Sequence, residues 1–364
     1  MLKHRKPSID PNFDRTYIEA LTALLRQVPT MRIDRVEHEA AITDELSVTA
    51  AVNVVELESA RMHRLVCEVR KSGQPRSVSL ALMHLLRVRQ SLKSNVVPIL
   101  IAPYLSPDSR RLILEQKVGY LDLQGNAHVE FGSIYIDREV STKPTAESRG
   151  LKSLFKPRSA LVLRLLLQDP AKQWRVVDLA KASGVSLGHV SNIRSALLDR
   201  EWTKDADAGM FLVRPDFLLD AWRDSYVAPT GESLRFYTPL HGSSFEDAAR
   251  RALADGAHAQ ATFASFSAGQ WLAPYGRTGT HYFYADKAGL DRLTVDLNLS
   301  SAAKGENVVI TMPKDKAILA DTIEPVPGVI CTNLVQTYLD LSIAGERGRE
   351  AAEHLRLEKL RWST

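Results

Sequence analysis

One stretch in the middle of the chain has polar residues in a pattern suited to contact nucleic acid. Within residues 187–200, Val190, Ile193 and Leu197 recur at helical spacing and should face inward, so the run predicts a helix. The other side is short-chained, polar and nearly free of acids, and it carries Gly188, His189, Ser191, Asn192 and Ser195, with Arg194 on its flank. Such a side can approach base edges in a major groove, where an asparagine can pair with adenine and an arginine can contact phosphate or guanine. We therefore expect a DNA-recognition helix here.

The residues before this helix have the pattern of a helix-turn-helix. Residues 160–167 predict a first helix, ended by Asp169-Pro170, and residues 174–182 predict a second. Ser183-Gly184-Val185-Ser186 comes next, in which Gly184 supplies a positive-φ turn position, Val185 fills the core and Ser186 caps the next helix. This spacing fits the tight crossing that two such helices need.

A hairpin is predicted directly after the recognition helix, in residues 202–214, with its turn at Asp205–Gly209. Together with the three helices it makes a winged helix-turn-helix, although acids at the tip argue against deep insertion into a minor groove. The residues expected to contact DNA are Ser186, Gly188, His189, Ser191, Asn192, Arg194, Ser195, Lys204, Arg175 and Arg158. The alternative interpretation is a three-helix unit that contacts another protein.

Charge is distributed unevenly around this unit. The net charge of +4 is mild and does not by itself indicate nucleic acid binding. Between Lys143 and Arg158, however, the sequence contains five basic residues and only one acid, Glu147. A local basic patch can attract phosphate, but a solvated linker explains the same stretch equally well.

The N-terminal region alternates strands and helices, which predicts a layered α/β domain. Its order of strand, strand, helix, strand and helix resembles the core of restriction-endonuclease-like nucleases. In those enzymes an acid on one strand and a Glu-x-Lys on the next hold a divalent metal and orient water. Here Glu68 is followed by Arg70, Lys71 is one place late, and Asn53 stands where the first acid is expected, so we predict an inactive nuclease-like domain without metal. Glu56 and Glu58 leave a shifted metal site open.

A second polar motif in this region, Asp122-Leu-Gln-Gly125-Asn126, has turn chemistry. An aspartate before a Gly-Asn turn can accept hydrogen bonds from its own backbone and hold two strands together. We expect this structural role rather than a ligand site.

The C-terminal region again predicts α/β structure. Strand-like runs cover 260–266, 280–284, 293–297 and 308–311, and helical runs cover 244–254, 334–344 and 347–359. Near the end, Asp340 lies in the run Thr-Asn-Leu-Val-Gln-Thr-Tyr-Leu-Asp-Leu (332–341), where it could pair with Arg347, and Gly-Glu-Arg-Gly-Arg-Glu-Ala-Ala-Glu-His-Leu (345–355) comes after it.

These two motifs, the Tyr-Leu-Asp-Leu-Gln-Gly-Asn run (120–126) and the central winged helix together resemble the AbiEi family of transcriptional-regulator antitoxins from type IV toxin–antitoxin systems. The resemblance implies a repressor that binds repeats in its own promoter, with a nucleotidyltransferase-type toxin as functional partner. The large N-terminal domain departs from the shorter antitoxins of this family. A metal-dependent nuclease and a ligand-sensing regulator stay open as alternatives.

The sequence thus predicts an α/β multidomain protein of three parts: a nuclease-like α/β domain at 1–142, a winged helix-turn-helix at 151–226 and an α/β domain at 233–364. We expect no enzyme activity, cofactor or metal, because no nucleophile–base pair, phosphate-binding glycine loop or histidine cluster is evident. No apolar run approaches ~20 residues, so we expect no membrane span. The two cysteines lie far apart and the N-terminus lacks an apolar signal, which favours a cytoplasmic protein, and a homo-oligomer is possible.

Overall fold

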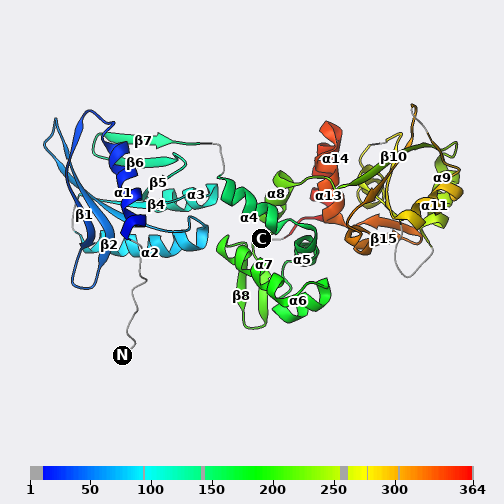
Figure 1. Cartoon of the computed structure of the whole chain (residues 1–364), viewed down its shortest axis with the longest axis horizontal. Coiled ribbons are helices and arrows are strands. Elements are labelled where there is room, and N and C mark those ends of the chain that lie inside the picture. Colours follow the sequence, from blue (N-terminus) through cyan, green and yellow to red (C-terminus); the bar gives the residue numbers. More distant parts are fainter. Residues whose placement is uncertain are drawn as a thin grey trace. The chain divides into compact units, whose positions relative to one another are not determined.

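The structure of the chain is a computed structural model that describes residues 11–92, 95–140, 144–254, 261–276, 278–301 and 304–362 (Figure 1). The chain divides into two compact units, one made of residues 1–148 with 197–201 and the other of 149–196 with 202–364. Lys143 of the predicted basic patch lies outside the described residues. The fold class is confirmed, because both units contain mixed α/β structure.

The first unit is built on a seven-stranded sheet whose strands lie side by side in sequence order. The strands are β1 (Met31–Ala41), β2 (Ser47–Glu56), β3 (Met62–Val69), β4 (Val96–Ala102), β5 (Gly119–Asp122), β6 (Ala127–Phe131) and β7 (Ile134–Arg138). Strands β3, β4 and β5 are parallel, connected by α2 (Pro75–Ser91) and α3 (Pro107–Glu115), and the other neighbours are antiparallel. The predicted order of strand, strand, helix, strand and helix is therefore present.

Alternating side chains on the strands give this sheet two apolar faces. Val52 and Val54 of β2 belong to the core that includes Leu21 of α1 (Pro11–Leu25). Ala51, next to Val52, belongs to the other core, with Leu85 of α2. Because successive side chains of a strand point to opposite faces, one run of small and branched residues fills both cores.

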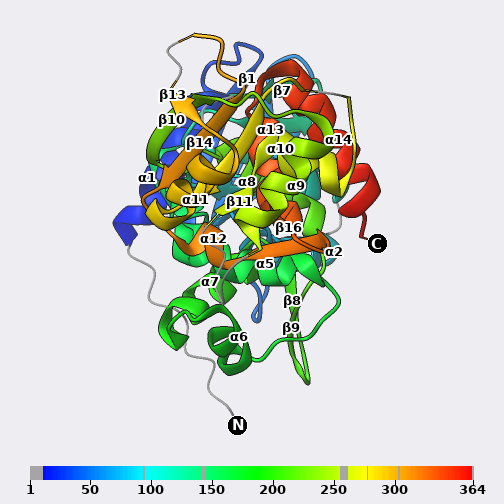
Figure 2. The same ribbon diagram turned by 90° about the vertical axis from the view of Figure 1, so that its right-hand side faces the viewer.

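The second unit ends in another seven-stranded mixed sheet, ordered β13-β10-β14-β12-β11-β16-β15. Its strands are β10 (Gly231–Tyr237), β11 (Ala261–Phe263), β12 (His281–Ala285), β13 (Ser300–Ser301), β14 (Val308–Pro313), β15 (Thr322–Val326) and β16 (Val329–Thr332). Helices lie on both sides of this sheet: α9 (Gly242–Leu253) and α11 (Lys287–Asp296) pack together, and α10 (Ser265–Leu272) packs with α13 (Leu334–Ser342) and α14 (Gly345–Lys359) (Figures 1 and 2). The short helix α12 (Ala317–Ala320) precedes β15.

One strand prediction in this sheet was wrong, and another was too long. The run 293–297 is the end of α11, which begins after Asp286, whose side chain accepts a hydrogen bond from the Gly289 amide at 2.9 Å. Leu290, Leu293 and Leu297 are all buried, at a spacing that fits one helix face. In the predicted run 260–266, of which Gln260 lies outside the described residues, Ala261–Phe263 form β11 and α10 begins at Ser265.

In the stretch of sequence that connects the two sheets, the chain is mainly helical. The elements are α4 (Thr145–Leu154), α5 (Pro157–Gln168), α6 (Val176–Ser183), α7 (Leu187–Asp199), β8 (Thr203–Ala206), β9 (Gly209–Leu212) and α8 (Pro215–Ser225). The elements from α5 to β9 are called the helix-turn-helix unit. None of the helices in the described part of the chain is both long enough and apolar enough to cross a membrane.

Candidate nucleic-acid interface

The crossing between α6 and α7 has the turn that the sequence predicted. Gly184 closes α6 in the left-handed conformation, with φ of 67°, and its amide donates to the Ala180 carbonyl. Val185 is buried, and the Ser186 carbonyl accepts from the Val190 amide at 3.0 Å as α7 begins. A glycine is suited to this turn because side chains with a Cβ disfavour positive φ.

Helix α7 has one buried and one exposed side. Val190, Ile193 and Leu197 are 0%, 3% and 0% exposed. The exposed residues on the other side are Ser186, Gly188, Ser191, Asn192 and Ser195. Among the described residues, the side chains of Ser191, Asn192 and Ser195 have no hydrogen-bond partner. Their donors and acceptors are therefore available to a ligand.

Two residues expected on this side are instead engaged within the unit. His189 is half-buried, and its Nε2 lies 2.9 Å from Oγ of Ser159, which fastens α7 to α5. Arg194 donates from Nε and Nη2 to the carboxylate of Asp205 on β8, at 3.2 and 2.5 Å. A bidentate pair of this kind orients the guanidinium but occupies the donors that would contact phosphate or guanine.

Strands β8 and β9 form an antiparallel hairpin after α7, in the place of a wing. Trp174, just before α6, forms a bridge to Met210 of β9 through paired backbone hydrogen bonds of 2.8 and 3.0 Å. Gly209 has φ of 138°, and a Cβ there would clash with the Trp174 backbone. This position therefore requires glycine, and it joins the hairpin to the helices.

The helix-turn-helix unit also carries exposed basic side chains. Arg158 is the second residue of α5, Arg175 precedes α6 and Lys204 lies on β8, and all three are exposed. In the part of the chain that the structure describes, none of the three forms a salt bridge. Exposed cations without a salt-bridge partner are suited to phosphate contacts, which position a protein on DNA without reading its sequence.

The acids of the N-terminal sheet, in contrast, are engaged in separate pairs. Glu68 is 3.1 Å from Arg70 and 3.3 Å from His84 of α2. Glu56 accepts from Ser59 at 2.6 Å and from the Ser133 amide at 3.0 Å, and these hydrogen bonds hold the pKa of its carboxyl below the ordinary value. In residues 11–92 and the other described segments, no three His, Cys, Asp or Glu residues are grouped as metal ligands.

Strand register separates the two positions at which restriction-endonuclease-like nucleases carry their metal ligands. Asn53 of β2 pairs with Arg64 of β3, and Ala50 pairs with Cys67, next to Glu68. Asn53 is therefore about four residues, or roughly 13 Å, along the strands from Glu68, because a strand rises ~3.3 Å per residue. Glu56 lies still farther along β2. The shifted site that the sequence left open, with Glu56 or Glu58 beside Glu68, is thus not formed.

The structural role predicted for Asp122 is confirmed. Its Oδ1 accepts from the amides of Gln124 and Asn126, at 2.9 and 3.0 Å. Its Oδ2 accepts from the Leu105 amide at 3.1 Å and from Asn126 Nδ2 at 2.8 Å. Asn126 Oδ1 in turn accepts from Arg110 and from the Val140 amide. The two side chains fasten four segments around the β5–β6 turn.

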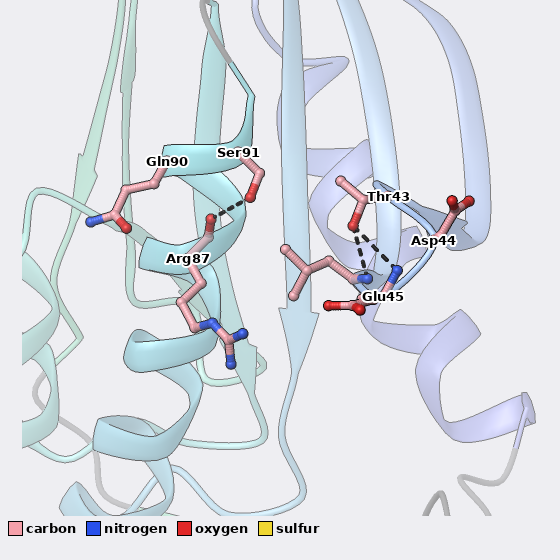
Figure 3. Close-up of a pocket in the computed structure, with 7 residues that line it drawn as sticks. Thr43, Asp44, Glu45, Arg87, Gln90 and Ser91 are labelled. Carbon is pink, nitrogen blue, oxygen red and sulfur yellow. Dashed lines mark hydrogen bonds between the residues drawn. The ribbon is translucent and has the colours of Figure 1, made fainter.

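The first unit also contains a hollow of about 550 Å³, whose lining is poorly suited to bind a small molecule (Figure 3). Arg87, Gln90 and Ser91 come from α2, and they lie across from the turn that contains Thr43 and Glu45 (Figure 3). Thr43 Oγ1 accepts from the amides of Glu45 and Leu46, so it stabilises its own turn. Exposed charges of both signs line the hollow without an apolar wall, and small-molecule sites are mostly apolar.

Asp340 of α13 is engaged differently from the predicted pair with Arg347, which is not formed. The buried carboxylate accepts at Oδ1 from Tyr226, Tyr284 and Gln336, at 2.5, 3.1 and 2.9 Å. Its Oδ2 is buried without a partner in the described part of the chain. Burial raises the pKa of Asp340 to about 6.

These observations define an α/β protein of several parts with a central helix-turn-helix and an adjoining hairpin. Residues 211–360 match the family described as transcriptional regulator, AbiEi antitoxin, type IV TA system. The predicted resemblance to this family of regulators is thereby confirmed for the C-terminal part of the chain. No curated protein matches the sequence significantly.

Among solved structures, this chain is similar to a repair endonuclease from Pyrococcus abyssi, at 13% identity and a TM-score of 0.24, over 33% of this chain and 49% of that one. A complex of EndoMS with double-stranded DNA matches at 14% identity and a TM-score of 0.23, over 34% and 48%. EndoMS in its apo form matches at 17% identity and a TM-score of 0.21, over 33% and 48%. The chain thus covers about half the length of these proteins.

Proposed function

We propose that this protein is a sequence-specific DNA-binding transcriptional regulator that binds promoter DNA through a winged helix, with α7 in the major groove. The observation that carries the proposal is the outward side of α7, where Ser191, Asn192 and Ser195 are exposed and have no internal partner among the described residues. Short polar side chains let a helix backbone approach base edges closely, and an asparagine can read adenine through two hydrogen bonds.

In this proposal the residues around α7 have different tasks. Ser186, Gly188, Ser191, Asn192 and Ser195 face the bases, while Arg158, Arg175 and Lys204 contact phosphates. His189 positions α7 through Ser159 instead of reading a base. Arg194 contacts DNA only when it leaves Asp205. A homo-oligomer would place two α7 helices on repeated half-sites about one helical turn of DNA apart.

We also propose that the three predicted parts, 1–142, 151–226 and 233–364, divide the work, with the central part on DNA. The match of residues 211–360 to a family of transcriptional regulators and AbiEi antitoxins supports a regulatory role. In this proposal the protein is a cytoplasmic repressor and antitoxin, and its functional partner is a nucleotidyltransferase-type toxin. Co-expression with a nucleotidyltransferase encoded next to this gene tests that role. Restored growth is the expected result, and unrelieved toxicity in cells that contain the folded protein would contradict it.

The decisive experiment selects genomic fragments bound by the full chain and then compares two glycine variants on the selected fragment. A Cβ at Gly188 or at Gly279 would meet nothing within 4 Å, so both positions have room for a side chain. Gly188→Glu places a carboxylate on the outward side of α7, where it repels phosphate, and we expect at least a hundredfold weaker binding. Gly279→Glu makes the same chemical change in the C-terminal sheet domain and should bind as the unmodified protein does.

Equal binding by the two variants, with both folded by circular dichroism, would contradict the proposed interface. Failure to enrich any fragment would contradict sequence-specific binding altogether.

A further inference from the structure

A pocket of about 460 Å³ lies within the second unit, where α4, α5 and α8 meet α12 and α13. This volume is within the range of small-molecule sites, which is roughly 300–1,000 Å³. Phe155, Trp222 and Ile318 give the pocket an apolar wall. The rings of Phe155 and Trp222 are stacked with centroids 5.6 Å apart and planes 5° apart, so the wall is flat on that side.

Three basic residues also line the pocket. Lys152 and Lys156 are exposed and, within the described residues, form no salt bridge. Arg164 of α5 is only 7% exposed; its Nε pairs with Asp321 and its Nη1 contacts Gln336 Oε1 at 3.5 Å. The guanidinium has five N–H donors, and those on Nη2 have no partner in the described part of the chain.

A single acid, Asp315, is part of the lining, and it already has a local task. Asp315 is exposed, and its Oδ1 accepts from the Ala317 amide at 3.0 Å where α12 begins. Asp321 balances the charge of Arg164, so the charge left over in the lining is that of the two lysines against Asp315. The pocket is therefore apolar on its wall and cationic at its edge.

We infer that this pocket is a binding site for an amphipathic organic anion, with a flat apolar body and one carboxylate, sulfonate or phosphate group. The body packs on the Phe155–Trp222 wall, where burial of apolar surface contributes roughly 25 cal/mol per Å². The anionic group contacts Lys152, on α4, and Lys156, the residue that precedes the first residue of α5. DNA phosphates would satisfy the lysines but would leave the aromatic wall unused.

The test uses the full chain and the fluorescent probe 8-anilino-1-naphthalenesulfonate, an aromatic sulfonate whose emission rises in apolar surroundings. We expect saturable binding to one site, and at least tenfold weaker binding by the variant Lys152→Gln with Lys156→Gln. The matched control, Lys181→Gln with Lys359→Gln, removes two exposed lysines outside the pocket and should leave the affinity unchanged. Uncharged N-phenyl-1-naphthylamine should bind both double variants equally, because it has no anionic group.

Non-saturable binding of the sulfonate, or equal affinity in the two double variants, would overturn the inference. The inference would also be overturned if Lys152→Gln with Lys156→Gln lost as much affinity for the uncharged probe as for the sulfonate. The two lysines would then not act through their charge. The inference does not depend on DNA binding: Gly188→Glu changes α7 and not the pocket lining. That variant should bind the sulfonate normally even where it has lost DNA.

Discussion

The outward side of α7 and the Asp122–Asn126 turn are both polar, and both have residue types suited to bind a ligand. At the turn, every contact is internal: the Asp122 carboxylate accepts four hydrogen bonds from protein donors and is 2% exposed. On α7, Asn192 is exposed and has no hydrogen-bond partner among the described residues. A polar cluster therefore indicates a binding site only where its hydrogen-bonding capacity is not already used by the fold.

The difference predicts opposite consequences of substitution. Removing a closed cluster leaves buried donors without partners and costs stability. Removing a side chain from the open face exposes nothing that was buried, so it should cost binding and little else. Substitutions in the two kinds of cluster can therefore break or sharpen the contrast.

Asp122→Ala should have the largest effect, a loss of roughly 3–5 kcal/mol of stability in the N-terminal sheet, because buried unsatisfied donors cost ~1–3 kcal/mol each. The amides of Leu105, Gln124 and Asn126 all lose their acceptor. Hydrogen exchange of peptides from β5 and β6 measures the loss directly. Asp137→Ala, which removes a half-exposed carboxylate from the neighbouring β7, is the control and should change exchange little. Equal protection in both variants would show that the closed network is not stabilising.

Asp340 is an intermediate case, because one oxygen of its buried carboxylate accepts hydrogen bonds while the other, Oδ2, has no partner in the described part of the chain. Burial raises its pKa to about 6 from an ordinary value near 3.8, so the folded state binds this proton more tightly than the unfolded state does. Stability from this group is therefore present at low pH and is lost as pH rises from about 4 to about 6, by roughly 3 kcal/mol in total at 1.36 kcal/mol per pKa unit.

The measurement compares the pH dependence of unfolding of the full chain with that of Asp340→Asn, which keeps the shape of the side chain without its titration. We expect the difference in unfolding free energy between the two proteins to move in favour of the asparagine variant as pH rises through this window. A difference that stays constant with pH would mean that burial does not shift this group.

Much of the contrast could be predicted from sequence because it rests on local patterns. Gly184, Val185 and Ser186 are neighbours, and the buried and exposed sides of α7 result from helical spacing. The Asp122 turn could be predicted for the same reason, since three of the four hydrogen bonds to its carboxylate come from residues at most four positions away.

The features that could not be predicted depend on distant partners. His189 meets Ser159 across 30 residues, and Arg194 meets Asp205 on another element, so neither engagement shows in the helix pattern. Strand β1 lies at the edge of the sheet, and its residues are mostly exposed or half-buried and polar. Because it lacks apolar alternation, only its pairing with β2 identifies it as a strand. The distance between Asn53 and Glu68 depends on strand register, which the sequence pattern does not reveal.

On the open side, Asn192→Ala should weaken binding to the selected DNA by about 10- to 100-fold, since a bidentate base contact discriminates by ~1–3 kcal/mol. The melting temperature should stay unchanged, because the side chain is exposed and unpartnered in the described structure. Gln168→Ala, an exposed amide at the end of α5, is the matched control. If the melting temperature fell together with the affinity, Asn192 would stabilise the fold, as Asp122 does, and would not be a residue that acts in binding alone.

The smallest expected effect concerns Arg194, the residue of the proposed α7 interface that is paired with an acid of the hairpin. Asp205→Asn removes the charge and one of the two acceptor oxygens that hold Arg194, so DNA binding should strengthen by a few-fold. The dependence on log salt should become steeper by ~1 because one more phosphate contact forms. Asp207→Asn deletes the same charge at the tip of the hairpin, where the residue is exposed. If the ion pair with Asp205 keeps Arg194 from contacting a phosphate, only Asp205→Asn should steepen the salt dependence. Adding Arg194→Gln to Asp205→Asn should then abolish the gain in affinity. Equal gains from the two substitutions would mean that the wing acids act through overall charge alone, and that the Arg194–Asp205 pair belongs to the fold and not to the interface.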